Sequence, residues 1–421
     1  MKALFFLRHY NDIDHVTPVV YKWIERGHSC DVVLLGESHF REDFRVVYLA
    51  GLDGVRVAHI NALFNRRQSA RMRVQKLAQD RNLRALLPPL VTRLIDRLLG
   101  RERRLRFWEK MARLILRRSF SPGEKGVVTF DWISSNSVFP IEFVQTVVAT
   151  AREMGLNAVS LPHGDSPHAN LLVRVEELTL TPHTKFSPAS MFARVVVPNE
   201  LCANRFRPFV DASSVAVLGS PRYCDEWLAK LATLLPDNPL QDKPGKLKIV
   251  MFLRKSDFSI FWEEVERVIR LLAAFPAVEL IVKAHTRGGW KQPLSRSVGL
   301  RRLQNVHFVA AKVHSAHLLE WADVIVDIAT SVAFEAVKCK KPVLAADYLH
   351  AGLSTVGKYM PECILHCRDD IYSKVDDFIN NGCDQFYVEA HRRLFLAEIV
   401  DVPDADVLPR YVNLLESQAA G

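Results

Sequence analysis

The sequence lacks the cysteine patterns of structural zinc sites and of disulfide-linked secreted domains. Its seven cysteines are scattered over 421 residues without a C-x-x-C pair. Cys363 and Cys367 form a C-x3-C pair, but no second pair follows at the spacing that a zinc site requires. We therefore expect free thiols in a reducing compartment.

Glycine-rich phosphate loops and long hydrophobic runs are also missing. The chain has neither a G-x-G-x-x-G nor a Walker A motif, which argues against a dinucleotide or P-loop site. Near the N-terminus an apolar run of five residues ends at Arg8, and no later segment reaches the length that spans a membrane. We expect a cytoplasmic protein, with peripheral attachment to the inner face of the plasma membrane left open.

The chain does contain enough apolar sequence for two domains. With 49% hydrophobic residues, 421 residues exceed what one ordinary core accommodates. A Pro-, Asp- and Asn-rich stretch at 235–245 predicts a linker. The prediction is an N-terminal domain at 1–235, a C-terminal domain at 246–385, and C-terminal helices at 386–421 that cross back to the N-terminal domain.

Short buried strands alternate with helices in both halves, which is typical of parallel sheets covered on both faces. The strands predicted in the first half are Ala3–Leu7, Asp31–Leu35, Val127–Asp131, Asn157–Leu161, Val195–Val197 and Val215–Leu218. Those predicted in the second half are Lys248–Leu253, Val278–Lys283, Val306–Ala310, Val324–Ile328 and Pro342–Ala345. The predicted fold class is α/β with two Rossmann-like domains, in which ligands bind beyond the carboxyl ends of the strands.

Positive charge is concentrated between Asn65 and Arg118, where 17 Lys and Arg stand against four Asp and Glu. Apolar residues at helical spacing, including Val91 and Trp108, predict a basic helical insertion at 65–118. One interpretation is an interfacial helix on anionic lipid, with Trp108 at headgroup depth. The other is an insertion whose apolar stripe packs on its own domain. Nucleic acid is not an expected partner, because no recognition module accompanies the charge.

Three positions of the first half are candidates for proton transfer. His15 stands at a helix start, where acting on a substrate and packing are equally good interpretations. Asp131 ends a strand. His163 precedes a glycine on a turn just past another strand, which makes it a candidate general base or phosphate contact. The Asp12-Ile13-Asp14 sequence matches a two-carboxylate metal pattern, but with no further ligand in view we expect no metal.

The second half presents groups suited to a nucleotide diphosphate. Thr330 and Ser331 lie between a strand and a helix start, where hydroxyls and free N–H groups suit an anion. Glu335 lies one turn further on the same helix face, where a carboxylate can accept hydrogen bonds from a ribose. An ordinary capped helix is the alternative, but Glu335 does not stand at the capping-box position.

Two loops of the second half gather cations beyond strand ends. Arg254 and Lys255 lie on one, and Lys283, His285 and Arg287 lie on or beside the next. A diphosphate requires such converging donors, whereas ordinary solvated loop charges are the competing interpretation. The turn that begins at Gly219 is the further position assigned to the donor nucleotide.

The His-Gly turn, the Lys-Ala-His-Thr-Arg loop and the Ser-Val-Ala-Phe-Glu-Ala-Val helix together resemble the GT-B glycosyltransferase superfamily. Within it, the chain looks like bacterial enzymes of capsule, lipopolysaccharide and teichoic-acid assembly, including the CDP-glycerol glycerophosphotransferase group. The resemblance implies two Rossmann-like domains facing across a cleft, with the donor nucleotide on the C-terminal domain. The chain departs from the usual Lys-x-His-Pro by having Thr286 after His285.

The resemblance further implies that Lys283 and His285 contact donor phosphates, that Thr330 and Ser331 cap them, and that Glu335 holds the ribose. The expected reaction is metal-independent transfer of a sugar or glycerophosphate from a nucleotide-activated donor to an acceptor hydroxyl, on a glycan or lipid-linked acceptor in cell-surface polysaccharide synthesis. His163 or His15 would be the base, and no cofactor is expected.

Two other functions fit the same architecture. A UDP-N-acetylglucosamine 2-epimerase binds a nucleotide sugar without an acceptor and needs carboxylates for proton transfer, for which Asp131 and Glu335 are the obvious candidates. A non-catalytic glycan-binding protein would keep the fold without the chemistry. Product formation without an acceptor identifies the epimerase, and failure of every nucleotide to raise the melting temperature favours the binding protein.

Overall fold

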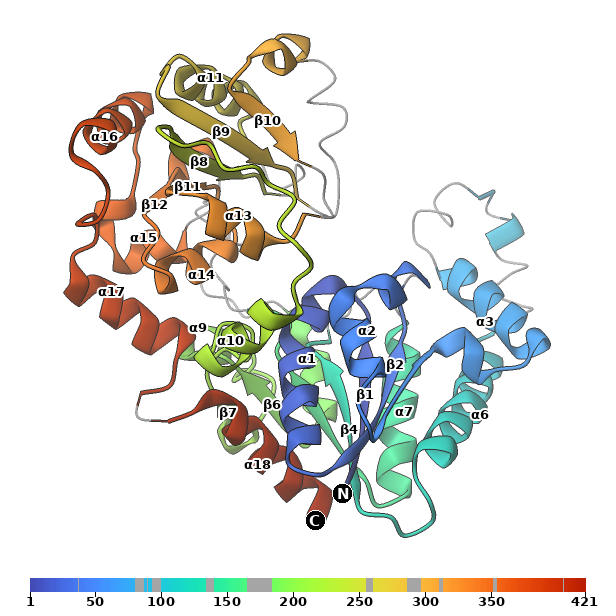
Figure 1. Cartoon of the computed structure of the whole chain (residues 1–421). Coiled ribbons are helices and arrows are strands. Elements are labelled where there is room, and N and C mark those ends of the chain that lie inside the picture. The colour runs from blue at the N-terminus through green and yellow to red at the C-terminus, as the bar shows by residue number, and fades with distance from the viewer. Residues whose placement is uncertain are drawn as a thin grey trace. The chain divides into compact units, whose positions relative to one another are not determined.

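The computed structural model describes residues 1–36, 38–79, 87–88, 90–92, 100–133, 140–164, 184–254, 260–285, 297–309, 313–350, 354–403 and 405–421. The chain divides into two compact units (Figure 1). The first unit takes in the described residues of 1–164, 184–234 and 405–421, and the second takes in those of 235–403. The described chain thus passes from the first unit to the second after Leu234 and returns after Pro403.

The first unit is built on a parallel sheet with the strand order β3-β2-β1-β4-β5-β6-β7. Its strands are β1 (Lys2–Leu7), β2 (Ser29–Leu34), β3 (Val55–His59), β4 (Gly126–Asp131), β5 (Asn157–Leu161), β6 (Arg194–Val197) and β7 (Val215–Val217). Its helices are α1 (Tyr10–Glu25), α2 (Phe44–Ala50), α3 (Arg66–Gln79), α6 (Arg101–Ser119), α7 (Ile141–Glu153), α9 (Glu200–Ala203), α10 (Asp225–Leu234) and α18 (Val407–Ala420).

The second unit is built on a smaller parallel sheet with the order β10-β9-β8-β11-β12. Its strands are β8 (Leu247–Phe252), β9 (Val278–Lys283), β10 (Val306–Val309), β11 (Val324–Asp327) and β12 (Val343–Ala345). Its helices are α11 (Trp262–Ala273), α13 (Ser315–Trp321), α14 (Val332–Lys338), α15 (Thr355–Tyr359), α16 (Arg368–Asn381) and α17 (Glu389–Phe395). The predicted α/β class with two parallel-sheet domains is confirmed.

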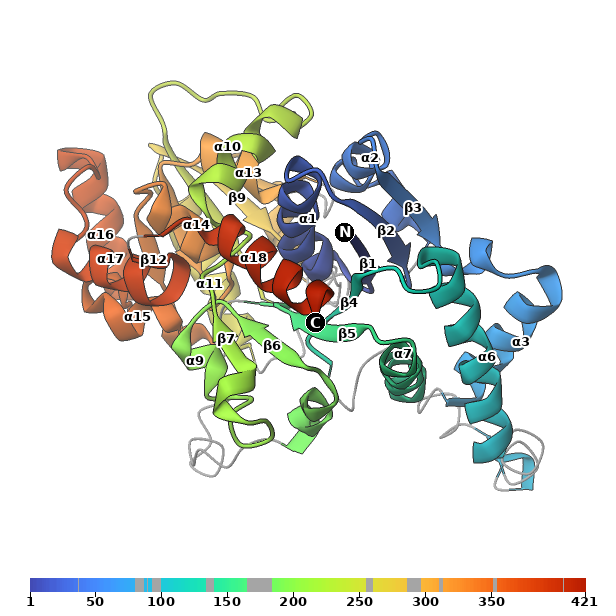
Figure 2. The ribbon, with the colours of Figure 1, turned by 90° about the horizontal axis from the view of Figure 1, so that it is seen from below.

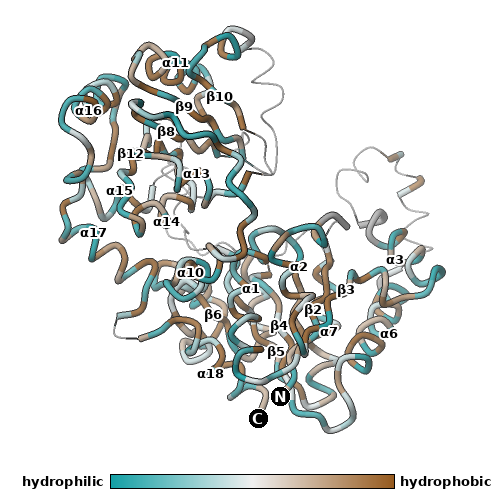
Figure 3. The backbone as a smooth tube through the Cα atoms, in the orientation of Figure 1, coloured by the Kyte–Doolittle hydropathy of each residue, from teal (hydrophilic) through white to brown (hydrophobic). Residues whose placement is uncertain are grey.

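Burial explains why these segments pair as strands. Every residue of β4 and of β9 is buried, as expected for central strands covered by helices on both faces. In Figure 3 the hydrophobic colour follows the strands of both sheets. The covering helices show one apolar face: in α11 the buried residues are Val265, Val268, Ile269 and Leu272, the spacing of a single helical stripe.

The last helix of the chain completes the first unit. Helix α18 lies against α1, β4 and β5 (Figure 2). It buries Leu408, Tyr411, Val412 and Leu415, and the Tyr411 hydroxyl donates a 2.8 Å hydrogen bond to the carbonyl oxygen of Gly219. The core of the first unit therefore combines residues from both ends of the chain.

On α6 the apolar stripe of the basic segment does not face solvent, whereas Val91, earlier in the same stripe, is exposed. Trp108 is fully buried on α6, with its ring centroid 5.4 Å from that of Phe143 on α7. Met111, Ala112 and Ile115 are buried beside it. The interpretation that placed Trp108 at lipid headgroup depth is therefore wrong, because the stripe packs on its own unit. The remainder of that prediction, at 93–99, lies outside the described residues.

Exposed cations remain on these helices. Arg66, Arg67, Arg71 and Arg73 of α3 are exposed, and α3 contains no acidic residue. Within the described residues, no helix is both long enough and apolar enough to cross a membrane.

Candidate functional site

The strand order of the first unit creates a switch point between β1 and β4. From β1 the chain proceeds through β2 to β3 on one side of the sheet, whereas β4 to β7 follow on the other. The loops leaving β1 and β4 therefore diverge, and the opening between them is where ligands bind in sheets of this kind. Arg8 follows the last residue of β1, Asp131 is the last residue of β4, and His163 lies two residues beyond β5.

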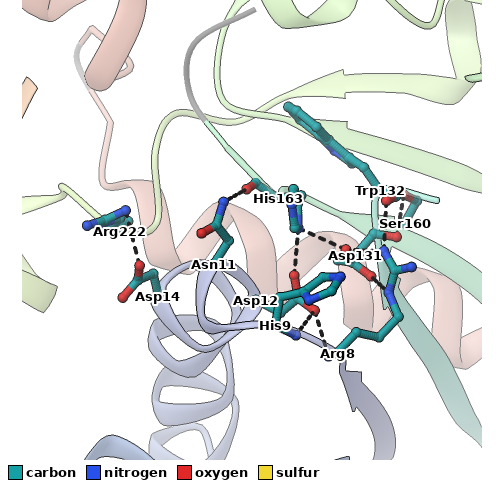
Figure 4. Close-up of polar contacts among 10 residues, drawn as sticks. All are labelled: Arg8, His9, Asn11, Asp12, Asp14, Asp131, Trp132, Ser160, His163 and Arg222. Atoms are coloured by element: carbon teal, nitrogen blue, oxygen red, sulfur yellow. Dashed lines mark hydrogen bonds and ion pairs between the residues drawn. The ribbon is translucent and has the colours of Figure 1, made fainter. Parts of the chain in front are cut away.

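A buried ion pair spans this switch point (Figure 4). The Nε of Arg8 donates to Oδ1 of Asp131 at 2.6 Å, and its Nη2 forms a short contact with Oδ2 and donates to the carbonyl oxygen of Trp132 at 3.1 Å. Burial raises the pKa of Asp131, but the positive charge of Arg8 and the bond with His163 outweigh it, so the pKa lies below its ordinary value. Asp131 is thus a carboxylate throughout the physiological range.

His163 stands between two carboxylates. Its Nδ1 is 2.6 Å from Oδ1 of Asp12 and 2.9 Å from Oδ2 of Asp131. Burial lowers the pKa of His163, but the hydrogen bonds and charges of Asp12 and Asp131 together raise it to about 9. The ring is therefore an imidazolium at neutral pH. About a quarter of the side chain is exposed, whereas both carboxylates are buried.

Asp12 organises the loop that follows β1. Its Oδ2 accepts hydrogen bonds from the backbone N–H groups of Arg8 at 2.6 Å and His9 at 2.9 Å, while its Oδ1 meets His163. These contacts use the position of Asp12 in the first turn of α1, where a carboxylate also interacts favourably with the helix dipole. Asn11 adds a bond from its Nδ2 to the carbonyl oxygen of His163 at 3.3 Å.

Arg8, His9 and this role of Asp12 were not predicted from the sequence. A signal was present, because the polar loop RHYNDIDH leaves the first strand of a parallel sheet. The motif-based interpretation paired Asp12 with Asp14 instead. In the structure Asp14 pairs with Arg45 and, at 3.1 Å, with Arg222, away from the network around His163 (Figure 4).

His15, the second predicted base, is buried on α1 with 1% of its surface exposed. Burial, followed by the charge of Arg222, lowers its pKa well below the ordinary value, so the ring is neutral. This placement favours the interpretation of His15 as a packing residue, because a base must reach its substrate.

One group in the described chain has the composition of a metal site. Single ligand atoms of Asp12, Asp131 and His163 lie within 4.8 Å of one another. In the structure, however, Arg8 and the imidazolium already neutralise the two carboxylates, and a metal would have to displace the Nδ1 proton. The residues present therefore suit proton chemistry better than metal binding.

The second unit has its own switch point, between β8 and β11. Here Arg254, two residues beyond β8, donates from Nη1 to the carbonyl oxygen of Ala329 at 2.7 Å. Ala329 adopts a left-handed conformation with φ of 52°. Thr330 follows it and donates to Asp327 from its backbone N–H at 3.0 Å and from its hydroxyl at 2.5 Å. Burial raises the pKa of Asp327 to about 6 in spite of these bonds.

The other predicted donor-site residues lie at the carboxyl end of the same sheet or on α14. Lys283 is the last residue of β9, is 7% exposed, and has its pKa lowered by burial to about 8. His285 is half-buried two residues later. Ser331 precedes α14, and Glu335 is buried within it.

Three predicted positions fall elsewhere. Gly219 belongs to the first unit, where its carbonyl accepts the Tyr411 hydroxyl and its φ is 86°. Lys255 and Arg287 lie outside the described residues. The assignment of Lys283, His285, Ser331 and Glu335 to nucleotide binding stays a prediction that this placement allows.

Comparisons with known proteins identify the fold. No family model matches the chain, and no curated protein matches its sequence. Among solved structures, the UDP-GlcNAc 2-epimerase from Neisseria meningitidis bound to UDP-GlcNAc is similar, with a TM-score of 0.58, 10% identity and 100% of both chains covered. The HepE protein of Anabaena in complex with UDP and glucose has a TM-score of 0.54 at 12% identity, covering 100% of this chain and 99% of that one.

The glycosyltransferase of kitacinnamycin is also similar, with a TM-score of 0.52, 12% identity and coverage of 99% and 98% of the two chains. At these identities the likeness shows the fold alone. The predicted GT-B fold is thereby confirmed. The narrower resemblance to CDP-glycerol glycerophosphotransferases stays a prediction.

Proposed function

We propose that this protein is an enzyme that acts on a UDP-activated sugar and inverts the carbon next to the anomeric carbon, as UDP-GlcNAc 2-epimerases do. The observation that carries the proposal is the position of the His163 ring, whose Nδ1 lies 2.6 Å from Oδ1 of Asp12 and 2.9 Å from Oδ2 of Asp131. Two carboxylates raise its pKa to about 9, so at neutral pH the ring can donate a proton but cannot accept one. The transferase that we expected from the sequence requires His163 or His15 as a base, and His15 is buried.

Inversion at that carbon requires the transfer of a proton. The proton becomes removable when the bond from the anomeric carbon to the diphosphate oxygen breaks in the same step. The electron pair of the C–H bond then forms a carbon–carbon double bond, and the diphosphate leaves with the electron pair of the broken C–O bond. In the return step the double-bond electrons take up a proton at the opposite face of the same carbon, and the diphosphate oxygen bonds again to the anomeric carbon. An imidazolium at the departing oxygen stabilises this developing negative charge. We assign this role to His163. Asp12 and Asp131 keep its ring protonated, so that it can hydrogen-bond the diphosphate oxygen.

The second unit is the proposed site of the uridine diphosphate. The fold likeness supports a uridine nucleotide as the ligand, because the epimerase and the HepE protein were both solved with uridine nucleotides bound. Lys283 is a suitable phosphate contact. Burial lowers its pKa, and the negative charge of a bound phosphate would raise the pKa again and keep the side chain protonated. Glu335 is the proposed ribose contact, and Thr330, Ser331, His285 and Arg254 are proposed around the phosphates.

The direct test is turnover of UDP-GlcNAc in D2O without any acceptor. We expect the 2-epimer to appear by NMR and to carry deuterium at the inverted carbon, because the proton passes through a group that exchanges with water. His163→Gln should lower the rate by about 10²–10⁴-fold. His366→Gln, which changes an exposed histidine of the second unit, is the matched control. Absence of both epimer and deuterium with every UDP-sugar tested would contradict the proposal.

A transferase is the second candidate, and the hydrogen bond between His163 and Asp12 is the observation that favours it. A histidine oriented by a carboxylate is the usual arrangement of a general base, once its pKa falls in a substrate complex. This candidate predicts that UDP, or CMP from CDP-glycerol, is released only when a glycan or lipid-linked acceptor is added. If no uridine or cytidine nucleotide raises the melting temperature, a non-catalytic glycan-binding protein is favoured instead.

The exposed arginines of α3 support a weaker proposal about location. With the apolar stripe of α6 buried, binding to an anionic membrane surface would rest on charge, at about 1 kcal/mol per cation near the surface. Flotation with phosphatidylserine vesicles, compared with phosphatidylcholine vesicles, tests it. We expect binding to the anionic vesicles only, and to be abolished when Arg66, Arg67, Arg71 and Arg73 are changed to Gln.

A further inference from the structure

A second histidine stands beside His163 on the first unit. His9 follows Arg8 after β1 and precedes α1, and its ring centroid lies 5.8 Å from that of His163 with the planes at 71°. The ring is half-buried. Figure 4 shows the two imidazoles on either side of Asp12. The His9 side chain caps α1 against the backbone N–H of Asp12, which leaves its other ring nitrogen for a ligand.

One carboxylate fixes the positions of both histidines. Oδ2 of Asp12 accepts the backbone N–H of His9 at 2.9 Å, and Oδ1 meets Nδ1 of His163 at 2.6 Å. Asp12 therefore holds the His163 ring through its carboxylate, and it meets His9 at the backbone N–H and through the helix cap. Its charge raises the pKa of both rings, but for His9 burial has the larger effect.

Those surroundings push the two rings to opposite protonation states. Burial is the largest influence on His9 and lowers its pKa. The charge of Asp12, which is next in size, raises this pKa, the positive charges of His163 and Arg8 lower it, and Asp131 raises it, so the net shift is downward. His163 is driven the other way, to about 9. Neighbouring titratable groups whose environments separate their pKa values in this way are typical of an acid and base acting together.

We infer that His9 and His163 act as a base and an acid on adjacent bonds of one substrate, with Asp12 as the residue that positions both. The inference rests on the proposed function and deepens it. His9 takes the proton of the breaking C–H bond, whose electron pair forms the double bond to the anomeric carbon. His163 hydrogen-bonds the diphosphate oxygen that leaves with the other electron pair. Two rings in edge-to-face contact match two neighbouring bonds, whereas they leave no room for a sugar between them.

The first experiment does not depend on turnover. The full chain is labelled with 15N-histidine, and the two rings are assigned from the single variants His9→Gln and His163→Gln. We expect His9 to titrate below 6.5 and His163 near 9 in the free protein. Asp12→Asn should lower the pKa of His163 by at least one unit, because it removes the negative charge at Nδ1. If His9 titrates at or above His163, the pairing is wrong.

The second experiment uses the deuterium exchange reaction across pH 5–10. The wild-type profile of kcat/KM should be bell-shaped, with an acid limb set by His9 and an alkaline limb set by His163. His9→Gln should lower the rate about 10²–10⁴-fold and abolish the acid limb; His163→Gln should abolish the alkaline limb. His366→Gln should leave both limbs in place.

The two experiments separate the pairing from the proposed function. Divergent titrations without turnover of any UDP-sugar would overturn the proposed substrate while retaining the pair. Turnover with an unchanged acid limb in His9→Gln would retain the function and overturn the role of His9.

Discussion

Both sheets of this protein have an arginine that bonds across the switch point, but the group that accepts the bond differs between them. In each unit an arginine just beyond the first strand reaches across the switch point to the end of the fourth: Arg8 to the carboxylate of Asp131, and Arg254 to the carbonyl oxygen of Ala329. The first cation is neutralised by a buried acid. The second is bonded to an uncharged acceptor.

This difference determines what each unit is suited to do. In the first unit, ion pairs stabilise the charged forms of Asp131 and His163, so only protons need to move there. In the second unit, burial drives groups toward neutrality, lowering the pKa of Lys283 to about 8 and raising that of Asp327 to about 6. Where burial disfavours the charged form of a side chain, a ligand of opposite charge stabilises that form and gains binding free energy from the interaction. The comparison supports proton transfer on the first unit and anion binding on the second.

The largest expected effect comes from removing the two arginines. Arg8→Met leaves the buried Asp131 without its bidentate arginine and with the imidazolium of His163, which is shared with Asp12, and this should cost about 3–5 kcal/mol of unfolding free energy. Arg254→Met removes a bond to a neutral carbonyl and should cost about 1.5–3 kcal/mol. Hydrogen–deuterium exchange of β1 and β4, and separately of β8 and β11, measures each loss in its own unit.

Two controls make that comparison interpretable. Arg41→Met changes an exposed arginine and should stay within about 0.5 kcal/mol of the wild type. The double variant Arg8→Met with Asp131→Asn removes both charges, so it should recover part of the loss. A greater loss for Arg254→Met than for Arg8→Met would show that the second switch point carries hidden charge pairing.

The second effect is a different pH dependence for each unit. The pKa of His163 is raised from 6.5 to about 9, so its stabilising contribution is complete below pH 6.5 and is lost as pH rises through 9. The pKa of Asp327 is raised from 3.8 to about 6, so the folded state gains stability as pH falls through 6, and the gain is complete below 3.8. Each contribution amounts to at most about 3 kcal/mol.

Melting temperatures between pH 4 and 10 measure both windows, with one variant as the control for each. His163→Gln should flatten the loss between pH 6.5 and 9 and leave the acid window unchanged. Asp327→Asn should flatten the gain between pH 6 and 3.8 and leave the alkaline window unchanged. If either variant alters both windows, the two units do not titrate independently.

The smallest expected effect concerns the turn that Arg254 braces. Ala329 has a φ of 52°, a conformation that costs an ordinary residue about 1–2 kcal/mol and costs glycine much less. Ala329→Gly should therefore raise the unfolding free energy by about 0.5–1 kcal/mol after the entropy of the glycine is counted. Lys340→Gly, at a φ of 58° in the same unit, should show a similar gain. A loss in Ala329→Gly would mean that the alanine methyl group makes a compensating contact.

Much of the fold could be predicted because buried parallel strands are nearly continuous apolar runs. The strand predicted at Asn157–Leu161 and that at Val278–Lys283 agree with β5 and β9. The strand β3 at Val55–His59 was not predicted. It is an edge strand in which His59 alone is buried, so its short and partly exposed sequence gave a weak signal.

The site was harder to predict, because it depends on which side of a helix each residue faces. His163 and Asp131 could be found, since each follows or ends a recognisable strand. Asp12 and Asp14 looked like one metal-binding pair in the sequence. Once α1 begins at Tyr10, residues two apart no longer share a face, so Asp12 meets His163 while Asp14 meets Arg222. The neutral state of His9 depends on burial by distant segments, which no local pattern reveals.

The return of α18 has a consequence for how the protein is made. On the ribosome, β1 to β7 emerge early, but the side that α1, β4 and β5 present to α18 stays uncovered until residues 407–420 have been translated. During that interval the entire second unit is synthesised. A chain that stalls before α18 has been made would therefore display an apolar surface of the kind that chaperones and proteases recognise.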